Sequence, residues 1–241
     1  MIHYHGTPVG GTRQDGARFL AGRHALVPFP RQDDVGIVAE VCQSFVFDNG
    51  AFSIWNKGGT LDVDGYTRWV EDWHRHPGFD WALIPDVIDG DEAANDALLA
   101  AWPRALRGVP VWHLHESLER LQRLASEWSM VAFGSSGQWR SPGTAAWWKR
   151  MAAAMDAICD DKGRPACRLH GLRMLDPSIF QHLPFSSADS TNAAVNGGSI
   201  KRFGIYAPPT AGQRACVIAD RIEAHSSSSI WHRAPQLEIT L

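Results

Sequence analysis

Short apolar runs alternate with longer amphipathic stretches along the chain, and this alternation predicts repeated units of a β-strand followed by an α-helix or loop. The predicted strands are Ile2–His5, Ala25–Phe29, Ser44–Phe47, Trp81–Pro85, Val109–His113, Met130–Phe133, Arg168–Met174 and Phe185–Ala188. The predicted helices are Tyr66–His74, Asp91–Trp102, Ser117–Trp128, Thr144–Cys159, Asp176–His182 and Gln213–His225, with a helix or loop-helix over Thr191–Phe203. About seven or eight strands in this order favour a (β/α)8 TIM-like barrel over an open doubly wound sheet.

The composition fits one α/β domain. The chain has 241 residues, of which 44% are hydrophobic, so we expect a single barrel domain over residues 1–241. The tail, residues 226–241, begins with four serines and is expected to be flexible before a short terminal strand or extension. The chain contains neither a GxGxxG nor a GxxxxGK[ST] motif, which also argues against a nucleotide-binding open sheet.

Several classes of protein are disfavoured by what the chain does not contain. No run approaches the roughly 18 apolar residues of a membrane span, and the N-terminus has no basic segment followed by an apolar one. We therefore expect a soluble, cytoplasmic protein without a membrane partner. Four scattered cysteines form no CxxC or CxC pair, so they predict neither a disulfide framework nor a cysteine zinc site.

The charge is distributed unevenly along the chain. Residues 1–139 carry 11 basic and 18 acidic side chains, whereas residues 140–241 carry 12 basic and 8 acidic ones. Arginine accounts for 19 of the 23 basic residues, and its guanidinium forms bidentate bonds to phosphate. A phosphate-bearing partner could therefore bind the C-terminal part, although solvated surface arginines explain the same composition.

Three aspartates occur where predicted strands end. Asp48 lies in the segment Phe47–Ser53, Asp86 in Leu83–Asp89, and Asp189 in Phe185–Asn192. The carboxyl ends of barrel strands meet at one mouth, where barrel enzymes carry their catalytic groups. Each aspartate alone could serve a turn or cap a helix. Three of them at corresponding strand ends favour one site and an enzyme.

An ordered set of segments resembles the barrel-strand motifs of the tRNA-guanine transglycosylase superfamily. These segments are Phe47-Asp-Asn-Gly-Ala-Phe, Ile84-Pro-Asp-Val-Ile, Val111-Trp-His-Leu-His, Val131-Ala-Phe-Gly-Ser-Ser-Gly137, Leu169-His-Gly-Leu-Arg and Phe185-Ser-Ser-Ala-Asp-Ser-Thr-Asn. The resemblance covers roughly residues 45–195. The short chain and the motif Ser187-Ala-Asp-Ser-Thr-Asn192 are most similar to the phage and bacterial branch that inserts 7-deazaguanines into DNA.

The resemblance implies a base exchange, in which guanine in a polynucleotide is replaced by a free 7-deazaguanine without any cofactor. It implies Asp189 as the nucleophile on the sugar C1′ and Asp48 as the general acid/base. An ionised Asp86 would accept the N1–H and exocyclic amine of guanine. The remaining substrate contacts implied by the resemblance are Gly134, Ser135, His113 and His170, and either Phe52 or Trp112 would stack on the purine.

Two departures from the tRNA-acting members shape the expected partners. The CxCxxC zinc motif is missing, so we expect no family zinc subdomain and no metal. The C-terminal RNA-binding extension of some members is also missing, which favours DNA and leaves tRNA as the alternative. Arg173, Lys201 and Arg202 are candidates for positioning the phosphates. No pattern in the chain specifies an oligomeric state.

Two other interpretations remain open at this point. His3-Tyr-His5, His113, His170 and Asp189 resemble the metal ligands of amidohydrolase barrels, in which an HxH pair and a late aspartate hold zinc and activate water. The second interpretation is a non-catalytic barrel that binds nucleic acid or a partner protein through its basic C-terminal part. Binding by such a barrel would survive Asp189→Asn, whereas an enzyme would lose its turnover.

Overall fold

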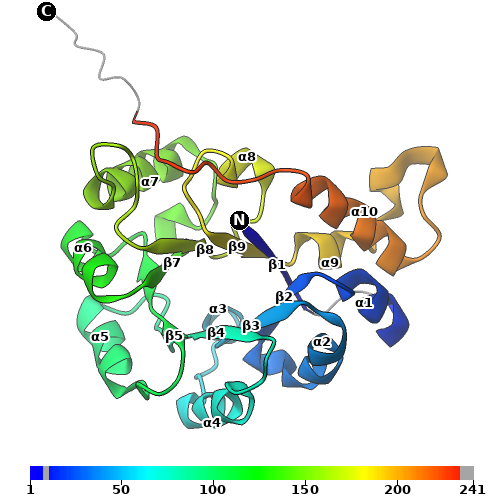
Figure 1. The fold of residues 1–241 in the computed structure, drawn as a ribbon, viewed down its shortest axis with the longest axis horizontal. Helices are drawn as coiled ribbons and strands as arrows, with labels where there is room; N and C mark the ends of the chain where they lie inside the picture. The colour runs from blue at the N-terminus through cyan, green and yellow to red at the C-terminus, as the bar shows by residue number, and fades with distance from the viewer. Residues whose placement is uncertain (8–10, 234–241) are drawn as a thin grey trace, which may run out of the picture.

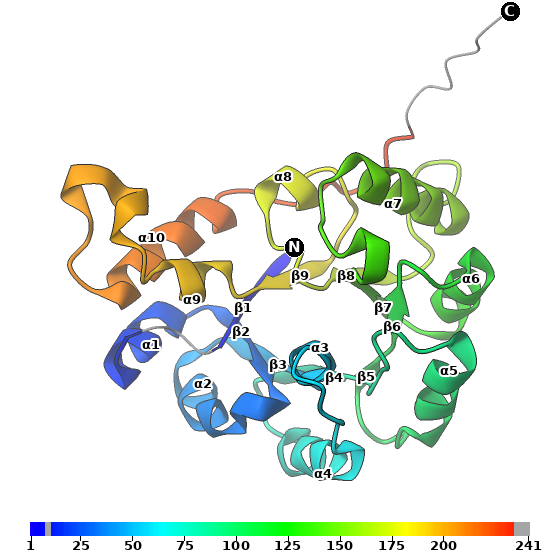
Figure 2. The same ribbon diagram turned by 180° about the vertical axis from the view of Figure 1, so that it is seen from behind.

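The computed structural model describes residues 1–7 and 11–233 and shows parallel strands that form a barrel surrounded by helices (Figures 1 and 2). The sheet order is β5-β4-β3-β2-β1-β9-β8-β7-β6, and every paired neighbour is parallel. The strands are β1 (Ile2–Gly6), β2 (His24–Pro28), β3 (Ser44–Asp48), β4 (Phe79–Leu83), β5 (Gly108–Val109), β6 (Val111–His113), β7 (Met130–Gly134), β8 (Arg168–Gly171) and β9 (Ser187–Ser190).

The two ends of this sheet are joined by a single residue, Pro110. Proline has no backbone N–H to donate, so the hydrogen-bond ladder of the sheet is interrupted at this residue. Strand β5, before Pro110, pairs with β4, and strand β6, after it, pairs with β7. The Pro110 carbonyl still accepts a hydrogen bond from the Ala132 N–H at 2.9 Å. The barrel is therefore nearly closed, and the prediction of a parallel α/β barrel is confirmed at this level.

Helices cover the outside of the barrel. The α-helices are α1 (Arg13–Leu20), α2 (Val35–Val41), α3 (Ala51–Trp55), α4 (Val63–Trp73), α5 (Glu92–Ala101), α6 (Leu118–Glu127), α7 (Ala145–Ile158), α8 (Pro177–Phe180), α9 (Asn192–Asn196) and α10 (Ala211–Glu223). Within the described residues, they are accompanied by the short 3-10 helices η1 (Phe29–Asp34), η2 (Gly137–Trp139) and η3 (Ile200–Tyr206). No described helix combines the length and apolar character needed to cross a membrane.

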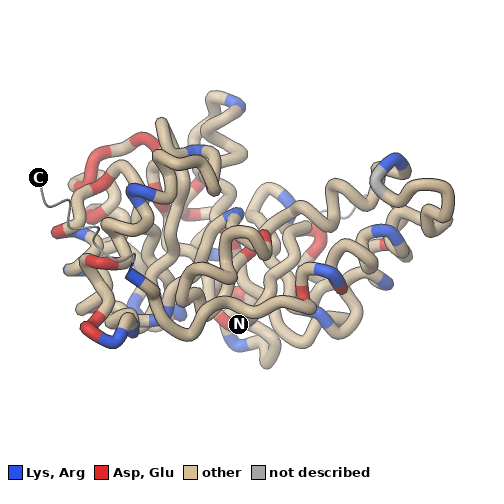
Figure 3. The backbone as a smooth tube through the Cα atoms, turned by 90° about the horizontal axis from the view of Figure 1, so that it is seen from above, with Lys and Arg blue, Asp and Glu red and all other residues tan. Residues whose placement is uncertain are grey.

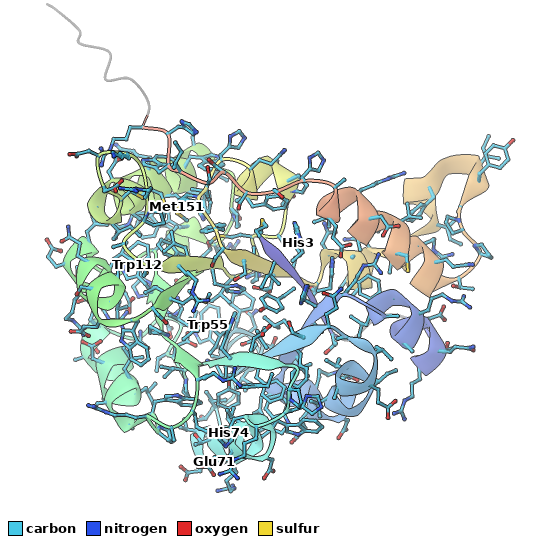
Figure 4. The ribbon with its side chains drawn as sticks, viewed as in Figure 1. His3, Trp55, Glu71, His74, Trp112 and Met151 are labelled. Carbon is cyan, nitrogen blue, oxygen red and sulfur yellow. The ribbon has the colours of Figure 1, made fainter. Side chains whose placement is uncertain are left out.

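Apolar side chains fill both the barrel and the layer between barrel and helices. Tyr4 and Trp81 belong to the cluster inside the barrel. Trp112 and Met151 belong to one of the two clusters of the outer layer, between β6 and α7 (Figure 4). Because successive strand residues point to opposite faces, each strand supplies both layers. This alternation determines which polar side chains can reach the barrel mouth.

The helix boundaries follow local capping signals. The Ser117 side chain accepts a hydrogen bond from the Arg120 N–H, as expected for the N-cap of α6. Helix α1 was not recognised in the apolar pattern, although Thr12 and Asp15 form a capping box at its start. Helix α2 was also missed. Its short length and apolar composition provide little amphipathic contrast.

Among the strand boundaries that differ from the prediction, those of β8 and β9 affect the mouth. Strand β8 ends at Gly171, three residues before the predicted Met174, because the chain turns at Arg173 with a positive φ of 60°. Strand β9 begins at Ser187 rather than Phe185, whose ring is buried in the outer apolar layer. Asp189 therefore lies inside β9 instead of directly after a strand.

The tail contacts the helix layer over its described part. Ser227 Oγ donates to the Phe185 carbonyl at 2.7 Å, and the Trp231 N–H donates to the Gly163 carbonyl at 2.7 Å. The Trp231 indole N–H donates to Asp156 at 2.7 Å. The predicted terminal strand or extension falls in residues 234–241, outside the described residues.

Candidate active site

One small pocket at the carboxyl ends of the strands brings together most of the residues singled out in the sequence. Its cavity volume is about 70 Å³, which is room for about five water molecules. Helix α3 lies across this mouth, near the barrel axis (Figure 2). The lining residues are Asp48, Asn49, Ala51, Phe52, Leu83, Asp86, Ile88, His113, Gly134, Ser135, Ser136, Leu172, Arg173 and Asp189.

The turn after β3 positions the first carboxylate and helix α3. The Asp48 Oδ1 atom accepts a hydrogen bond from the Gly50 N–H at 2.9 Å, and Gly50 adopts a left-handed φ of 76°. The Asn49 Oδ1 atom accepts a hydrogen bond from the Ala51 N–H at 2.8 Å. These local bonds start α3 directly above the strand, so that Phe52 lines the pocket and Trp55 lies over the mouth (Figure 4).

Asp48 is a pocket carboxyl whose pKa is raised. Burial first, and then the charges of Asp189 and Asp86, raise the pKa of the Asp48 carboxyl from 3.8 to about 7, against the lowering effect of the Gly50 N–H. A carboxyl with a pKa near 7 exchanges its proton readily at neutral pH. Asp48 is therefore suited to general acid/base catalysis.

The raised pKa also predicts a stability effect of Asp48→Asn. The folded protein holds a proton on Asp48 up to about pH 7, whereas the unfolded chain releases it near pH 3.8. The free energy of unfolding of the wild type therefore falls as the pH rises between these values. The asparagine variant has no carboxyl at this position, so its stability does not fall for this reason. At pH 8 we expect the variant to be more stable than the wild type by about 2 kcal/mol. A tenfold change in proton affinity corresponds to about 1.4 kcal/mol, and solvent in the pocket reduces the free-energy cost of ionising Asp48.

Urea denaturation of both proteins at pH 4.5 and pH 8 measures this difference. The advantage of the variant should grow from the lower to the higher pH. A variant that is less stable than the wild type at pH 8, or equally favoured at both pH values, would contradict the assignment of a raised pKa to Asp48.

Asp86 is fixed from two sides. Its Oδ1 atom accepts a hydrogen bond from the Asn49 side-chain amide at 2.7 Å, and its Oδ2 atom lies 2.8 Å from the Nε2 atom of His113. With Asp86 ionised, the imidazole Nε2–H is the donor. The His113 Nδ1 atom is buried and has no hydrogen-bond partner among the described residues. Asp86 and His113 thus form one rigid polar wall of the pocket.

Gly134 makes room for this wall. A Cβ atom at residue 134 would lie 2.7 Å from the His113 Nδ1 atom, closer than real Cβ contacts allow. The space that a side chain at residue 134 would need is therefore occupied by the His113 ring. This contact accounts for the glycine at residue 134 without any contact to a ligand. The adjacent Ser135 Oγ accepts a hydrogen bond from the Trp147 indole N–H at 2.9 Å, so it is also held by the protein.

Gly134→Ala should displace the imidazole and break its bond to Asp86. We expect the free energy of unfolding to fall by about 1–3 kcal/mol, as for other overpacked cores. The downfield imidazole Nε2–H signal of His113 should be lost in the NMR spectrum. Gly36→Ala is the matched control, because a Cβ there meets nothing within 4 Å. A variant that keeps the imidazole signal would show that the ring does not depend on Gly134.

Asp189 is held through one of its two oxygens. Its Oδ1 atom accepts the Arg173 N–H at 3.0 Å and lies 3.3 Å from the Nε2 atom of His170. Its Oδ2 atom accepts no hydrogen bond from a described residue. Residue 173 can present its N–H only because the chain turns there with positive φ, a conformation that non-glycine residues seldom adopt. The free Oδ2 atom is the oxygen available for reaction.

His170 and Trp112 lie elsewhere than expected. His170 is fully buried and does not line the pocket, but lies in contact with Asp189, with its Nδ1 atom 2.9 Å from the Ser187 hydroxyl. The structure therefore places His170 against Asp189 rather than at the pocket surface. Trp112 points into the outer apolar layer and its indole N–H donates to the Ser117 carbonyl, so it cannot stack on a ligand at the mouth.

The candidate phosphate contacts separate into two groups. Arg173 lines the pocket, and its guanidinium carbon lies 4.2 Å from the centre of the Phe52 ring. The cation covers that face of Phe52, so a ligand stacking there would have to displace it. Lys201 and Arg202 belong to η3, and Lys201 does not line the pocket. The side chain of Arg202 is outside the part of the protein that is described.

Asn49 was missed by the sequence analysis. Its amide joins Asp86 to the turn that carries Asp48, and so connects two of the three aspartates. The signal was present in the Asp-Asn-Gly sequence. It was read only as a turn, because such turns are common and the partner of the amide is 37 residues away.

The histidine arrangement does not match a metal-dependent hydrolase. His5 is bonded to Glu223 of α10 at 2.7 Å, and His3 contacts the His225 carbonyl at 3.0 Å. Both side chains therefore face the helix layer, and His3 is seen beside β1 in Figure 4. Within residues 1–7 and 11–233, no three His, Cys, Asp or Glu side chains are grouped as metal ligands.

Comparison of the sequence with family models and with curated proteins finds no match.

Proposed function

We propose that the protein is a base-exchange glycosyltransferase, which replaces a guanine in DNA with a free 7-deazaguanine through a covalent aspartyl-sugar intermediate. The observation that carries the proposal is the pairing of two different carboxylates in one small pocket. Asp189 has one anchored and one free oxygen, whereas Asp48 has a pKa of about 7. One carboxylate suited to attack and another suited to proton transfer are the two groups that glycosidic bond exchange requires.

In the first half-reaction, the Asp189 Oδ2 atom attacks the sugar C1′ and forms an ester bond. The bond between C1′ and guanine N9 breaks, and its electron pair stays on the base. Neutral Asp48 donates its proton to the departing guanine and becomes a carboxylate. The Oδ1 atom becomes the ester carbonyl oxygen and remains bonded to the Arg173 N–H, so the nucleophile does not reorient.

The second half-reaction reverses these steps with a different base. A free 7-deazaguanine replaces guanine in the pocket, and the Asp48 carboxylate removes the proton from its N9. The N9 atom attacks C1′, and Asp189 departs as a carboxylate. The sugar-phosphate backbone stays intact throughout, and no cofactor or energy source is consumed.

The wall formed by Asp86 and His113 supports recognition of a guanine-type base. Each oxygen of Asp86 already accepts one hydrogen bond and can accept another. These two free positions fit the N1–H and the exocyclic amine, which purines without a 2-amino group do not present together. This wall lines the cavity of about 70 Å³ at the barrel mouth.

The proposal is tested by supplying purified protein with duplex DNA or tRNA that carries labelled guanine, together with a free 7-deazaguanine. We expect repeated release of label from DNA when the deazaguanine is present, and release of no more than about one guanine per protein molecule in its absence. Release from tRNA alone would move the assignment to the RNA-acting enzymes. No release from either polynucleotide would leave the non-catalytic binding barrel as the better account.

A further inference from the structure

A segment beside the barrel exposes apolar side chains that no part of the reaction uses. Residues 197–209, here called the arm, contain η3 and connect α9 to α10, projecting outward from the barrel (Figures 2 and 3). Ile205 and Tyr206 are 93% and 92% exposed, more than any other large apolar side chain described. Solvated apolar side chains grouped at the tip of a projection are typical of a binding surface.

The base of the arm is firmly attached. The buried Arg214 of α10 donates from Nε to the Gly197 carbonyl at 2.6 Å and from Nη1 to the Pro208 carbonyl at 2.7 Å. One guanidinium thus joins the two ends of the arm. Gly204, with φ of 64°, turns the chain directly before Ile205 and Tyr206. The exposed tip therefore projects from an ordered base.

The arm starts at the rim that carries the pocket. Strand β9 contains Asp189 and leads directly into α9 and the arm. Residues 190–219 contain no aspartate or glutamate, whereas the arm itself contains Lys201 and Arg202. An uncharged aromatic tip, on a segment that also carries Lys201 and continues from the strand that bears Asp189, is complementary to the stacked bases and phosphates of a nucleic acid.

We propose that the arm is a DNA-binding element in which Ile205 and Tyr206 contact exposed bases and Lys201 contacts a phosphate. This inference rests on the proposed function, because base exchange requires the target nucleotide to leave the duplex. Apolar side chains that enter the base stack stabilise such an opened duplex. The arm and the pocket then bind the same strand on either side of the target nucleotide.

The test compares the wild type with the double variant Ile205→Ala and Tyr206→Ala, using fluorescence anisotropy on a guanine-containing duplex. We expect affinity about tenfold lower and a corresponding loss of exchange at subsaturating DNA. Val195→Ala is the matched control, since Val195 is 66% exposed on α9 outside the arm. Lys201→Ala should reduce the slope of log K against log salt by about 1. Unchanged thermal melting would show that the variants fold.

Three results would overturn the inference and have different meanings. If the wild type exchanges bases and the double variant binds DNA equally well, the arm has no role in binding and the proposed function stands. If the double variant sediments as a smaller species than the wild type and keeps its DNA affinity, the arm is an interface between two copies. If the wild type neither binds nor exchanges DNA, the proposed function fails together with the inference.

Discussion

Asp189→Asn is expected to lower the rate of base exchange by at least about 10³-fold, the largest effect of any single substitution in the pocket. The amide is a poor nucleophile and cannot form the ester with C1′. Asparagine has nearly the same shape, and its oxygen can still accept the Arg173 N–H that holds Oδ1. The fold and the DNA affinity of the variant should therefore stay unchanged, and the rate of the chemical step should fall.

Asp176→Asn provides the matched control for this substitution. Asp176 is an exposed N-cap of α8, a position that asparagine serves equally well. Its variant should exchange bases at the wild-type rate. An Asp189→Asn protein that retains more than about a tenth of the wild-type rate would exclude this carboxylate as the nucleophile, and the covalent mechanism with it.

The second large effect concerns the proton on Asp48. Because the pKa of Asp48 is raised to about 7, the acid form that protonates guanine prevails below pH 7 and is lost above it. In single-turnover experiments, guanine release should be constant at low pH and fall about tenfold per pH unit above pH 8. The return step needs the carboxylate and should show the opposite dependence. Asp48→Asn should remove both dependences and slow exchange by about 10²–10⁴-fold.

These profiles distinguish Asp48 from the other carboxylates of the pocket. A guanine release that is insensitive to pH between 6 and 9 would contradict the role of Asp48 as the acid. A variant at Asp86 offers the comparison, because it should weaken base binding and keep the fall of about tenfold per pH unit, with the midpoint moved to lower pH since the Asp86 charge helps to raise the pKa of Asp48. Asp86 contributes recognition through its contacts with the base rather than by proton transfer.

The parallel barrel could be predicted because its signal is local and repeated. Apolar strands and amphipathic helices alternate along the sequence, and the caps of helices such as α6 are encoded within four residues. The meeting of Asp48, Asp86 and Asp189 also followed from the sequence, since parallel strands end at one rim. In the structure, all three side chains line the pocket.

The parts that could not be predicted depend on contacts between distant residues. Asn49 bonds to Asp86 across two strands, and Arg173 supplies a backbone N–H to Asp189 through an unusual turn. His170 was expected at the pocket surface, but it is buried on β8, in contact with Asp189 of β9. Neither the sequence spacing nor the residue type carries information on such pairings.

The most direct measurement of the central claim is mass spectrometry of the protein after incubation with a guanine-containing oligodeoxynucleotide, without any free 7-deazaguanine. The account predicts a covalent protein-DNA conjugate whose linkage maps to the peptide containing Asp189, with release of free guanine and disappearance of the conjugate when deazaguanine is added. A conjugate at another residue, or guanine exchange without any conjugate, would contradict it.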